Sequence, residues 1–427
     1  MTETIILTRM CLSFPQSIFL LYDIPTPLMR VLSIVSLISC ASLFPLFWSL
    51  DDSDKVTISE EPNRLLKLAP AEYQLASENE ILELKRKGVN FMDITGSLDG
   101  FDISNDEDFV AIQQAHAETP VTVYTYPTAI SYADEVKSII DGISIGRMRK
   151  KLTKFSSFFT RYYKTTYGVD SADWLFSQVE AIAAPVKDKI TVIKFAHDGW
   201  DQYSIIARIH GQVDDKVVVG AHQDSINLKL PMTLRAPGAD DDGSGSITIL
   251  EAYTLLVEQI QRGKFTPYNT LEFHWYSAEE VGLLGSQNVF NHYAAVNATV
   301  LGMLQQDMTG YTRGTLASGR EIHFGMATDF VSPELTKFVQ LIIESYTDIP
   351  YRTGNFGYAA SDHGSANKNG FPSAFMMEAL PQSLDTKDNW GHSERDTMDL
   401  IDFNHVRDHT KVSIGYAYEL SLARNLY

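Results

Sequence analysis

A chain of 427 residues is long enough for one large domain with additional segments, or for two domains. Apolar residues make up 44% of the chain and charged residues 21%, which are the proportions of an ordinary globular protein and exclude a largely disordered one. The formal net charge of −19 argues against a nucleic-acid partner, because a surface that binds nucleic acid needs basic patches to meet the phosphates.

The first fifty residues contain an uncharged apolar stretch at residues 31–48. A basic residue before such a stretch and small residues near its end are typical of a secretory signal peptide. A stretch of this length could also form a membrane anchor, although Pro45 interrupts it. We therefore assign residues 1–50 to a signal peptide and expect a secreted, extracellular protein. A signal anchor is the alternative, and an upstream extension before Met29 is left open.

Cysteine is confined to this N-terminal region, where the chain has Cys11 and Cys40. Once residues 1–50 are removed, the mature protein has neither a disulfide nor a thiolate ligand. A metal site in it would have to be built from His, Asp and Glu side chains.

Residues 51–118 are polar, acidic and weakly periodic, with one predicted helix at residues 76–88. Such a segment is typical of a pro-segment or a mobile N-terminal region. We predict a weakly structured pro-segment that keeps the protein as a zymogen and acts as an intramolecular partner of the domain at residues 119–427.

In the remaining chain, strand patterns alternate with helix patterns. Two helices are predicted between residues 156 and 183, separated by Gly168. Strands are predicted at residues 203–211, 216–222, 270–277, 299–308, 321–327 and 372–380, and helices at residues 245–262, 286–295, 332–347 and from about residue 399. This alternation indicates an α/β fold with a mostly parallel central β-sheet and helices on both faces.

Ionisable side chains gather where the predicted strands end. They are His222 and Asp224, Glu279 and Glu280, Asp307, the triplet Asp240, Asp241 and Asp242 before a helix, and Asp362, His363 and His392 further on. Each alone could be a helix cap or a strand terminator. Ligands of open α/β sheets, however, bind at the carboxyl ends of the strands. Carboxylates gathered at one such edge repel each other unless cations neutralise them, so the pattern indicates a metal site.

The donor set combines carboxylates with imidazoles, which suits Zn²⁺. Two histidines and three carboxylates are too many for one tetrahedral zinc that keeps an open position. They fit two metals that each take one histidine and one carboxylate and share a bridging aspartate. Two such metals can lower the pKa of a water between them and stabilise a developing oxyanion. The sequence therefore predicts two zinc ions per chain.

Six motifs occur in a familiar order: "GAHQDS", "APGADDDGSG", "SAEEVGLLGS", "QQDMTGY", "GYAASDHGS" and "HSERDT". In this order they resemble the M28 di-zinc aminopeptidases, most closely the secreted fungal leucine aminopeptidases. The similarity runs from about residue 156 to the C-terminus. Residues 83–95 also resemble the pro-segments of the fungal enzymes.

The resemblance implies a role for each motif residue. His222 and Asp307 would hold one zinc, Glu280 and His392 the other, and Asp241 would bridge the two. Glu279 would be the general base that takes the proton from the metal-bound water, and Tyr358 would stabilise the tetrahedral oxyanion. Asp224 would orient the His222 ring. A cis peptide bond is expected between Asp241 and Asp242.

One departure from the family is visible at the tyrosine loop. The disulfide that often flanks this tyrosine is missing, because Phe356 and Ala360 occupy its positions. Candidates for an apolar substrate pocket are Met308, Phe356, Phe375 and Met377, and packing in the core is the alternative for each of them.

Three further positions have simpler interpretations. Asp362 and His363 are expected to be structural, and His274 a core histidine in mid-strand. Asn297 begins the sequon "NAT", which predicts N-glycosylation of a secreted chain.

The resemblance implies a secreted, monomeric two-zinc metallo-aminopeptidase that removes bulky apolar residues such as leucine from the N-termini of peptides or proteins. Another hydrolase on the same scaffold, such as a carboxypeptidase or deacylase, would need a basic group near the strand ends for the substrate carboxylate. A glutaminyl-cyclase-like transferase would lack part of the ligand set. The intact Glu279 argues against an inactive binding domain.

Overall fold

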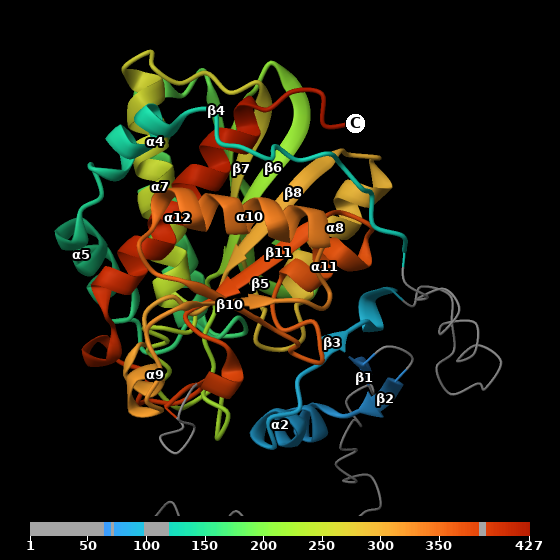
Figure 1. Cartoon of the computed structure of the whole chain (residues 1–427). Helices are drawn as coiled ribbons and strands as arrows, with labels where there is room; N and C mark the ends of the chain where they lie inside the picture. Colours follow the sequence, from blue (N-terminus) through green and yellow to red (C-terminus); the bar gives the residue numbers. More distant parts are fainter. Residues whose placement is uncertain (1–63, 70–71, 98–118, 384–389) are drawn as a thin grey trace, which may run out of the picture. The chain divides into compact units, whose positions relative to one another are not determined.

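The computed structural model describes residues 64–69, 72–97, 119–383 and 390–427 (Figure 1). The predicted signal peptide and the alternative anchor at residues 31–48 lie outside these ranges. Within them, no helix is long and apolar enough to span a bilayer. All described residues belong to the unit Glu61–Tyr427.

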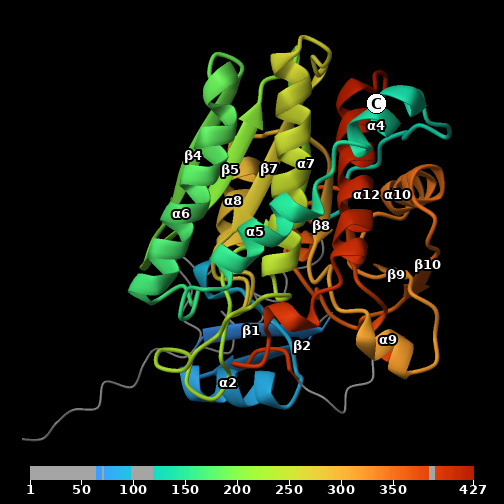
Figure 2. The same ribbon diagram turned by 90° about the vertical axis from the view of Figure 1, so that its left-hand side faces the viewer.

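An eight-stranded sheet runs through this unit (Figures 1 and 2). Its strands, in spatial order, are β10 (Tyr351–Gly354), β9 (Phe324–Ala327), β11 (Ser373–Met377), β8 (Val300–Gln306), β6 (Val213–His222), β7 (Asn269–Tyr276), β5 (Trp200–Ile209) and β4 (Ile190–His197). The central strands β11, β8, β6 and β7 are parallel, and so are β10 and β9. The β9–β11, β7–β5 and β5–β4 pairs are antiparallel. The mostly parallel sheet that the sequence predicts is confirmed.

The central strands are apolar because helices cover both of their faces. Every residue of β7 and β8 is buried, as expected for parallel strands inside an α/β sheet. Side chains alternate between the faces: Val217 and Val219 of β6 join the larger hydrophobic cluster, and Val218 joins the cluster on the opposite face.

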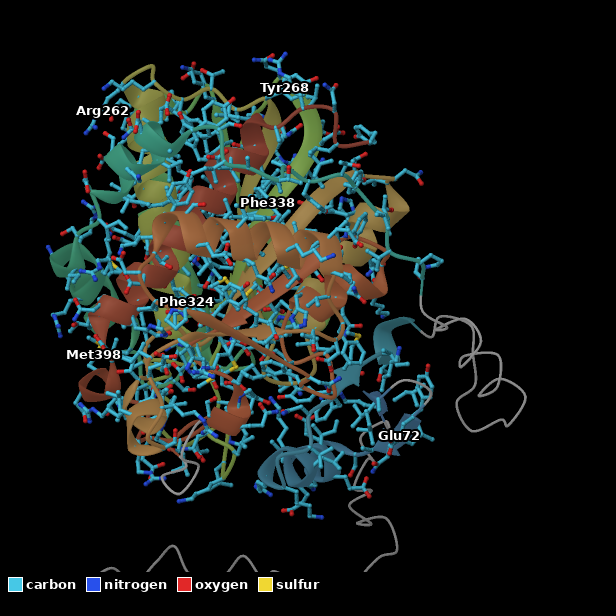
Figure 3. All side chains as sticks on the ribbon, in the orientation of Figure 1. Glu72, Arg262, Tyr268, Phe324, Phe338 and Met398 are labelled. Carbon is cyan, nitrogen blue, oxygen red and sulfur yellow. The ribbon has the colours of Figure 1, made fainter. Side chains whose placement is uncertain are left out.

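Helices form a layer on each side of the sheet (Figure 2). The larger layer contains α4 (Ala133–Ile140), α5 (Ile145–Phe155), α6 (Thr166–Ala183), α7 (Gly243–Gln261), α10 (Pro333–Tyr346) and α12 (Phe403–Leu422). The opposite layer contains α8 (Leu284–Ala295) and α11 (His363–Lys368), while α9 (Arg313–Ala317) follows β8. Figure 3 shows Phe324 and Phe338 inside the core and Arg262 at the periphery.

The prediction of two helices around Gly168 is wrong. Only α6 forms, and Gly168 lies in its first turn, where its N–H donates to the Thr165 hydroxyl. A side chain at this position would collide with the carbonyl oxygen of Tyr162. The glycine therefore permits the preceding loop to pack closely on the start of the helix, which its sequence pattern does not reveal.

The segment before residue 98 has its own small sheet. Its strands are β1 (Arg64–Ala69), β2 (Glu72–Ala76) and β3 (Met92–Asp93), and its helix is α2 (Glu78–Arg86). The predicted helix at residues 76–88 is thus confirmed, and Ser77 and Glu80 form a capping box at its start. The N–H of Asp93 donates to the carbonyl of Gly282, which ties the segment to the loop after β7.

Candidate metal centre and active site

Three neighbouring parallel strands bring their polar ends to one edge of the sheet. His222 is the last residue of β6, the Glu279–Glu280 pair lies in the loop after β7, and Asp307 directly follows β8. Because β6 lies between β7 and β8 with the same direction, these side chains converge as the sequence predicts.

Two groups of side chains at this edge, all buried except the partly exposed His392, could each hold a cation. One contains His222, Asp242 and Asp307, and the other Asp241, Glu280 and His392. Asp241 connects the groups, because its Oδ1 lies 3.1 Å from His222 Nε2 and its Oδ2 lies 3.0 Å from His392 Nε2. All five predicted ligands therefore lie together, with His222 Nε2 3.5 Å from Asp307 Oδ1 and His392 Nε2 3.2 Å from Glu280 Oε2.

Asp242 differs from its neighbour Asp241 in what its carboxylate contacts. The Asp242 oxygens accept N–H groups from His222 at 3.1 Å, Gly245 at 2.9 Å and Met308 at 3.1 Å, so it caps α7. These hydrogen bonds occupy both lone pairs of its Oδ1 and one of its Oδ2, whereas Asp241 is the carboxylate that faces both histidines. The peptide bond between the two aspartates is cis, as the family resemblance implies.

The donor atoms of this cluster fit a metal ion. Among the described residues, buried His222 Nε2, Glu280 Oε1 and Asp307 Oδ1 make no contact with hydrogen-bond geometry, although carboxylate oxygens lie 3.1 and 3.5 Å from the imidazole nitrogen. Buried polar atoms normally have one, so such a concentration of unsatisfied donor atoms calls for another partner. Imidazole nitrogen and carboxylate oxygen are donors that Zn²⁺ prefers.

The electrostatic field of the cluster also favours positive charge. Burial alone would lower the pKa of His392, but Glu280 and Asp241 outweigh burial and raise it to about 10. Burial likewise opposes protonation of His222, yet Asp307 and Glu279 raise its pKa well above the ordinary value. The same carboxylates that stabilise these protons would stabilise metal ions, and metal binding would have to release the protons.

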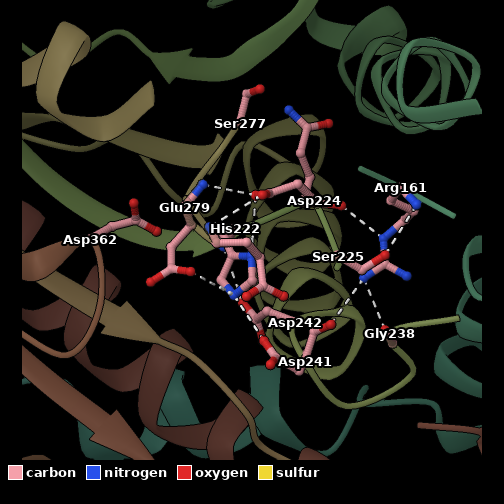
Figure 4. A network of polar contacts seen from close by, with 12 residues as sticks. Arg161, His222, Asp224, Ser225, Gly238, Asp241, Asp242, Ser277, Glu279 and Asp362 are labelled. Atoms are coloured by element: carbon pink, nitrogen blue, oxygen red, sulfur yellow. Dashed lines mark hydrogen bonds and ion pairs between the residues drawn. The ribbon is translucent and has the colours of Figure 1, made fainter. Parts of the chain in front are cut away.

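Asp224 contacts two parts of the cluster, the His222 ring and the backbone of the glutamate pair (Figure 4). Its Oδ1 is 3.4 Å from His222 Nδ1, consistent with the predicted role of orienting that ring. It also accepts the N–H groups of Glu279 at 3.0 Å and Glu280 at 3.3 Å. This second contact, which sequence reasoning missed, fixes the backbone of the glutamate pair relative to His222.

The Glu279 side chain points toward the cluster but lies farther from His222 than the candidate ligands beside that ring do. Its Oε2 lies 3.9 Å from His222 Nε2, farther than the carboxylates of Asp241 and Asp307. Burial raises the pKa of Glu279 well above its ordinary value. A carboxylate placed in this way can exchange a proton with a molecule bound beside it.

A cavity of about 130 Å³ opens beside these groups. Its polar wall includes Asp241, Glu279, Glu280, Asp307 and His392, and its other lining residues include Tyr358 and all four predicted substrate residues, Met308, Phe356, Phe375 and Met377. Burial and the charge of Glu279 raise the pKa of Tyr358 to about 12, so its hydroxyl stays a hydrogen-bond donor at neutral pH. The cavity therefore combines a charged wall with an apolar one.

The histidines and acids outside the cluster have structural environments. His274 is buried in mid-strand and contacts Glu272 and the Tyr276 hydroxyl, each at 2.9 Å, as expected of a core histidine. His363 stacks on the Phe375 ring with centroids 4.7 Å apart. Asp362 accepts a hydrogen bond from Gln305 at 2.9 Å.

Arg161 is a site residue that sequence reasoning missed. It is fully buried, and its guanidinium donates to the carbonyl oxygens of Gln223, Pro237 and Gly238 (Figure 4). Its charge therefore holds the loop that leads to Asp241. A charged residue in a predicted helical region is normally solvated, so the pattern offered no signal for this role.

Lys85 of α2 reaches the metal cluster from the N-terminal segment. Its Nζ donates to the Glu280 carbonyl oxygen and lies 3.3 Å from Glu280 Oε2. Burial would lower the pKa of Lys85, but the carboxylates of Glu280, Glu279 and Asp241 raise it. A cation of the chain itself thus lies against a predicted zinc ligand.

Comparisons with known proteins agree with this geometry. The profile described as Peptidase family M28 matches residues 204–417. Leucine aminopeptidase 1 of Uncinocarpus reesii is 44% identical over 413 residues, covering 92% of this chain and all of the relative. A probable aminopeptidase of Saccharomyces cerevisiae is 44% identical over 363 residues, covering 84% of this chain and 93% of the relative.

A solved structure, the LapA aminopeptidase of Legionella pneumophila, superposes with a TM-score of 0.70 at 27% identity over 84% of this chain and 94% of that chain. The fold, the donor cluster and these relatives define the class of the protein, a metallo-aminopeptidase. The chain belongs to peptidase family M28, whose members are zinc peptidases.

Proposed function

We propose that this metallo-aminopeptidase binds two zinc ions and removes bulky apolar residues, leucine first, from the N-termini of peptides. The observation that carries the proposal is the position of Asp241, whose two oxygens lie 3.1 and 3.0 Å from the Nε2 atoms of two different histidines. His222 and Asp307 would hold one zinc, and Glu280 and His392 the other.

Bound zinc would polarise the scissile carbonyl and lower the pKa of the attacking water. Glu279 accepts a proton from that water as the oxygen attacks the carbonyl carbon. The Tyr358 hydroxyl donates a hydrogen bond to the oxyanion that forms. When the carbon–nitrogen bond breaks, Glu279 returns the proton to the leaving amine nitrogen, so that a free amino acid and a shortened peptide result.

The substrate's α-amine would lie against the charged wall of the cavity. Glu279, Glu280 and Asp241 line that wall and offer carboxylate oxygens to an N-terminal amine. An acetylated N-terminus has lost the basic amine and needs additional space, so we expect it to be rejected.

The apolar wall sets the preferred side chain. Phe375 and Met377 belong to a hydrophobic cluster on which Met308 and Phe356 pack. An apolar cavity of about 150 Å³ is large enough to hold benzene, and the cavity here measures about 130 Å³. The apolar wall of this cavity suits a branched aliphatic side chain such as that of leucine.

The N-terminal segment would hold the enzyme inactive until it is removed. The support is Lys85, whose ammonium lies 3.3 Å from Glu280 Oε2 and which lines the cavity together with Asn90. The exposed Lys87 in the same helix turn offers a matched control. We expect K85A, and not K87A, to raise the activity of the unprocessed chain, and removal of residues 51–97 to raise it further. Equal activity of all four proteins would contradict inhibition by this segment.

Secretion and glycosylation belong to the same proposal. The apolar stretch at residues 31–48 supports a signal peptide, and Asn297 is exposed just after α8. Secreted protein should lose mass on treatment with an N-glycosidase, and N297Q should not. Retention of the protein in the cell membrane would favour the signal anchor instead.

The decisive experiment is hydrolysis of leucine p-nitroanilide by protein lacking residues 1–50 and processed at its N-terminal segment. Its N-acetylated analogue serves as the matched substrate, and metal content is counted by mass spectrometry on the same sample. We expect cleavage of the free amine alone, loss of activity with a chelator, and two zinc ions per chain. Cyclisation of N-terminal glutamine with one bound zinc would instead establish the glutaminyl-cyclase alternative.

A further inference from the structure

Asp396 holds the backbone on both sides of the Asp240 Cα atom. Its Oδ1 accepts the N–H of Asp240 at 2.9 Å, and its Oδ2 accepts the N–H of Asp241 at 3.0 Å. Its backbone carbonyl accepts the N–H of Ala239 at 3.2 Å. Asp396 is only 1% exposed, so water does not compete for these bonds. One carboxylate thus uses both oxygens to fix consecutive N–H groups of the loop that carries Asp241.

The loop that carries Asp396 also carries His392. His392 Nε2 lies 3.0 Å from Asp241 Oδ2, so this loop contacts Asp241 at both its side chain and its backbone. The N–H of Leu228 donates to the carbonyl of His392, which fixes the other end of the loop. Any movement of Asp396 would therefore shift Asp241 and His392 relative to each other.

Arg161 holds the opposite polar groups of the same loop. Its guanidinium donates to the carbonyls of Pro237 and Gly238, and its Nη2 lies 3.4 Å from the carbonyl oxygen of Asp241. Backbone N–H groups thus face a carboxylate while backbone carbonyls face a guanidinium. This arrangement fixes the orientation of the loop. The loop needs such support because its Asp241 side chain is surrounded by other carboxylates that repel it.

We propose that Asp396 is a positioning residue that sets the zinc affinity of both metal positions. It acts through the backbone of Asp241. The side chain of Asp241 faces His222 on one side and His392 on the other. Because both positions share Asp241, weakening its placement lowers the affinity of both rather than of one. This inference rests on the two-zinc function proposed above.

The change from Asp396 to asparagine tests the contact with little change in size. Both carboxylate oxygens accept an N–H group, whereas an amide has one acceptor oxygen and presents an NH₂ group to the second N–H. Loss of a group that orients a metal ligand typically weakens metal binding by about 10–100-fold. We expect D396N to show a loss in this range for both zinc ions.

Asp399 provides the matched control. It is an exposed acid shortly after Asp396, and its side chain accepts a hydrogen bond from the Thr397 hydroxyl. D399N removes the same charge from the same region, but among the described residues the structure gives Asp399 no contact with the Asp240–Asp242 turn. We expect its zinc affinities to stay within about twofold of those of the wild type. D396E keeps both acceptor oxygens and should recover part of the affinity that D396N loses.

Zinc dissociation constants are measured by competition with a chromophoric chelator at constant pH, together with the thermal unfolding of each metal-free protein. Weaker binding of both zinc ions in D396N, with normal binding in D399N, supports the proposal. A D396N protein that binds both zinc ions within threefold of the wild type overturns it, even when its metal-free form unfolds at a lower temperature.

If D396N does not fold, D396E decides the question, because its longer side chain displaces the carboxylate by one methylene group. Measurably weaker binding in D396E then supports the proposal, and unchanged affinity for both metals overturns it. A wild-type protein that binds no zinc would instead contradict the proposed two-zinc function itself, so the two failures are distinguishable.

Discussion

The adjacent residues Glu279 and Glu280 should respond in different ways to the same substitution by glutamine. Glu279 Oε2 lies 3.9 Å from the nearest ligand nitrogen, His222 Nε2, whereas Glu280 Oε2 lies 3.2 Å from His392 Nε2. These distances support the proposed roles, in which the first glutamate moves a proton without being a ligand and the second is a ligand. E279Q should therefore affect the reaction rate, and E280Q should affect metal content.

The size of the first effect follows from the role of a general base. Proton transfer by a positioned side chain contributes about 10²–10⁴-fold, which corresponds to about 2.7–5.5 kcal/mol of activation free energy. E279Q keeps the size of the buried side chain, so we expect kcat to fall within this range while two zinc ions stay bound. E280Q should lose the zinc held with His392 and recover activity when zinc is added in excess.

The assay combines kcat for leucine p-nitroanilide with zinc counted on the same preparations. An E279Q enzyme that keeps more than a tenth of the wild-type kcat would refute the general-base role. An E279Q enzyme that loses as much zinc as E280Q would refute the division of labour between the two glutamates.

Three further predictions concern the pocket, the metals and pH. F356A should enlarge the cavity at its apolar wall and so lower kcat/KM for leucine p-nitroanilide about tenfold relative to the phenylalanine substrate. An unchanged ratio of kcat/KM between the leucine and phenylalanine substrates would contradict this. Chelation should lower the midpoint temperature of unfolding, because zinc binds the folded chain and ties separate strand ends together. Burial lowers the pKa of His405 to about 4. Since this lies below the unfolded value of 6.5, unfolding takes up a proton. The free energy of unfolding should therefore fall by about 1.4 kcal/mol for each unit by which the pH is lowered from 6.5 to about 4. In urea titrations of metal-free protein, H405Q should remove one proton's share of this slope, and an unchanged slope would contradict the reasoning.

The central fold could be predicted because its strands contain apolar stretches bounded by turns. The runs that end at His222, Tyr276 and Gln306 are buried on both faces, and a continuous apolar run bounded by turns is what the sequence shows. Once these strands are taken as parallel, their polar ends must meet, so the cluster of candidate ligands followed from fold class and residue type together.

The edges of the sheet could not be predicted in the same way. Strand β10 is short, and its Arg352 and Thr353 are exposed, so it has no apolar pattern to distinguish it from a loop. Strand β4 lies at the other edge of the sheet beside β5, and of its eight residues only the first and the last, Ile190 and His197, are buried. Such edge strands form because their backbone pairs with the backbone of the neighbouring strand. A local sequence pattern contains no information about that pairing.

The positioning residues were missed for a related reason. Arg161 binds carbonyl oxygens, and Asp396 binds N–H groups, and every residue has such backbone groups. Because only backbone groups of the contacted loop take part, the residue types in that loop give no sign of the contact. Asp224 was predicted to orient His222, yet its bonds to the N–H groups of the two glutamates were likewise invisible.

The carboxylate of Asp242 has a consequence for anyone who would redesign this centre. It joins the end of β6, the start of α7 and the residue after Asp307 through three N–H groups. Donor atoms that come from distant parts of the chain are therefore spaced by one shared side chain. A change of metal geometry cannot be made one ligand at a time, because shifting any of these segments moves the other two. The practical unit of engineering is the whole three-segment junction, and substitutions that preserve Asp242 leave that junction intact.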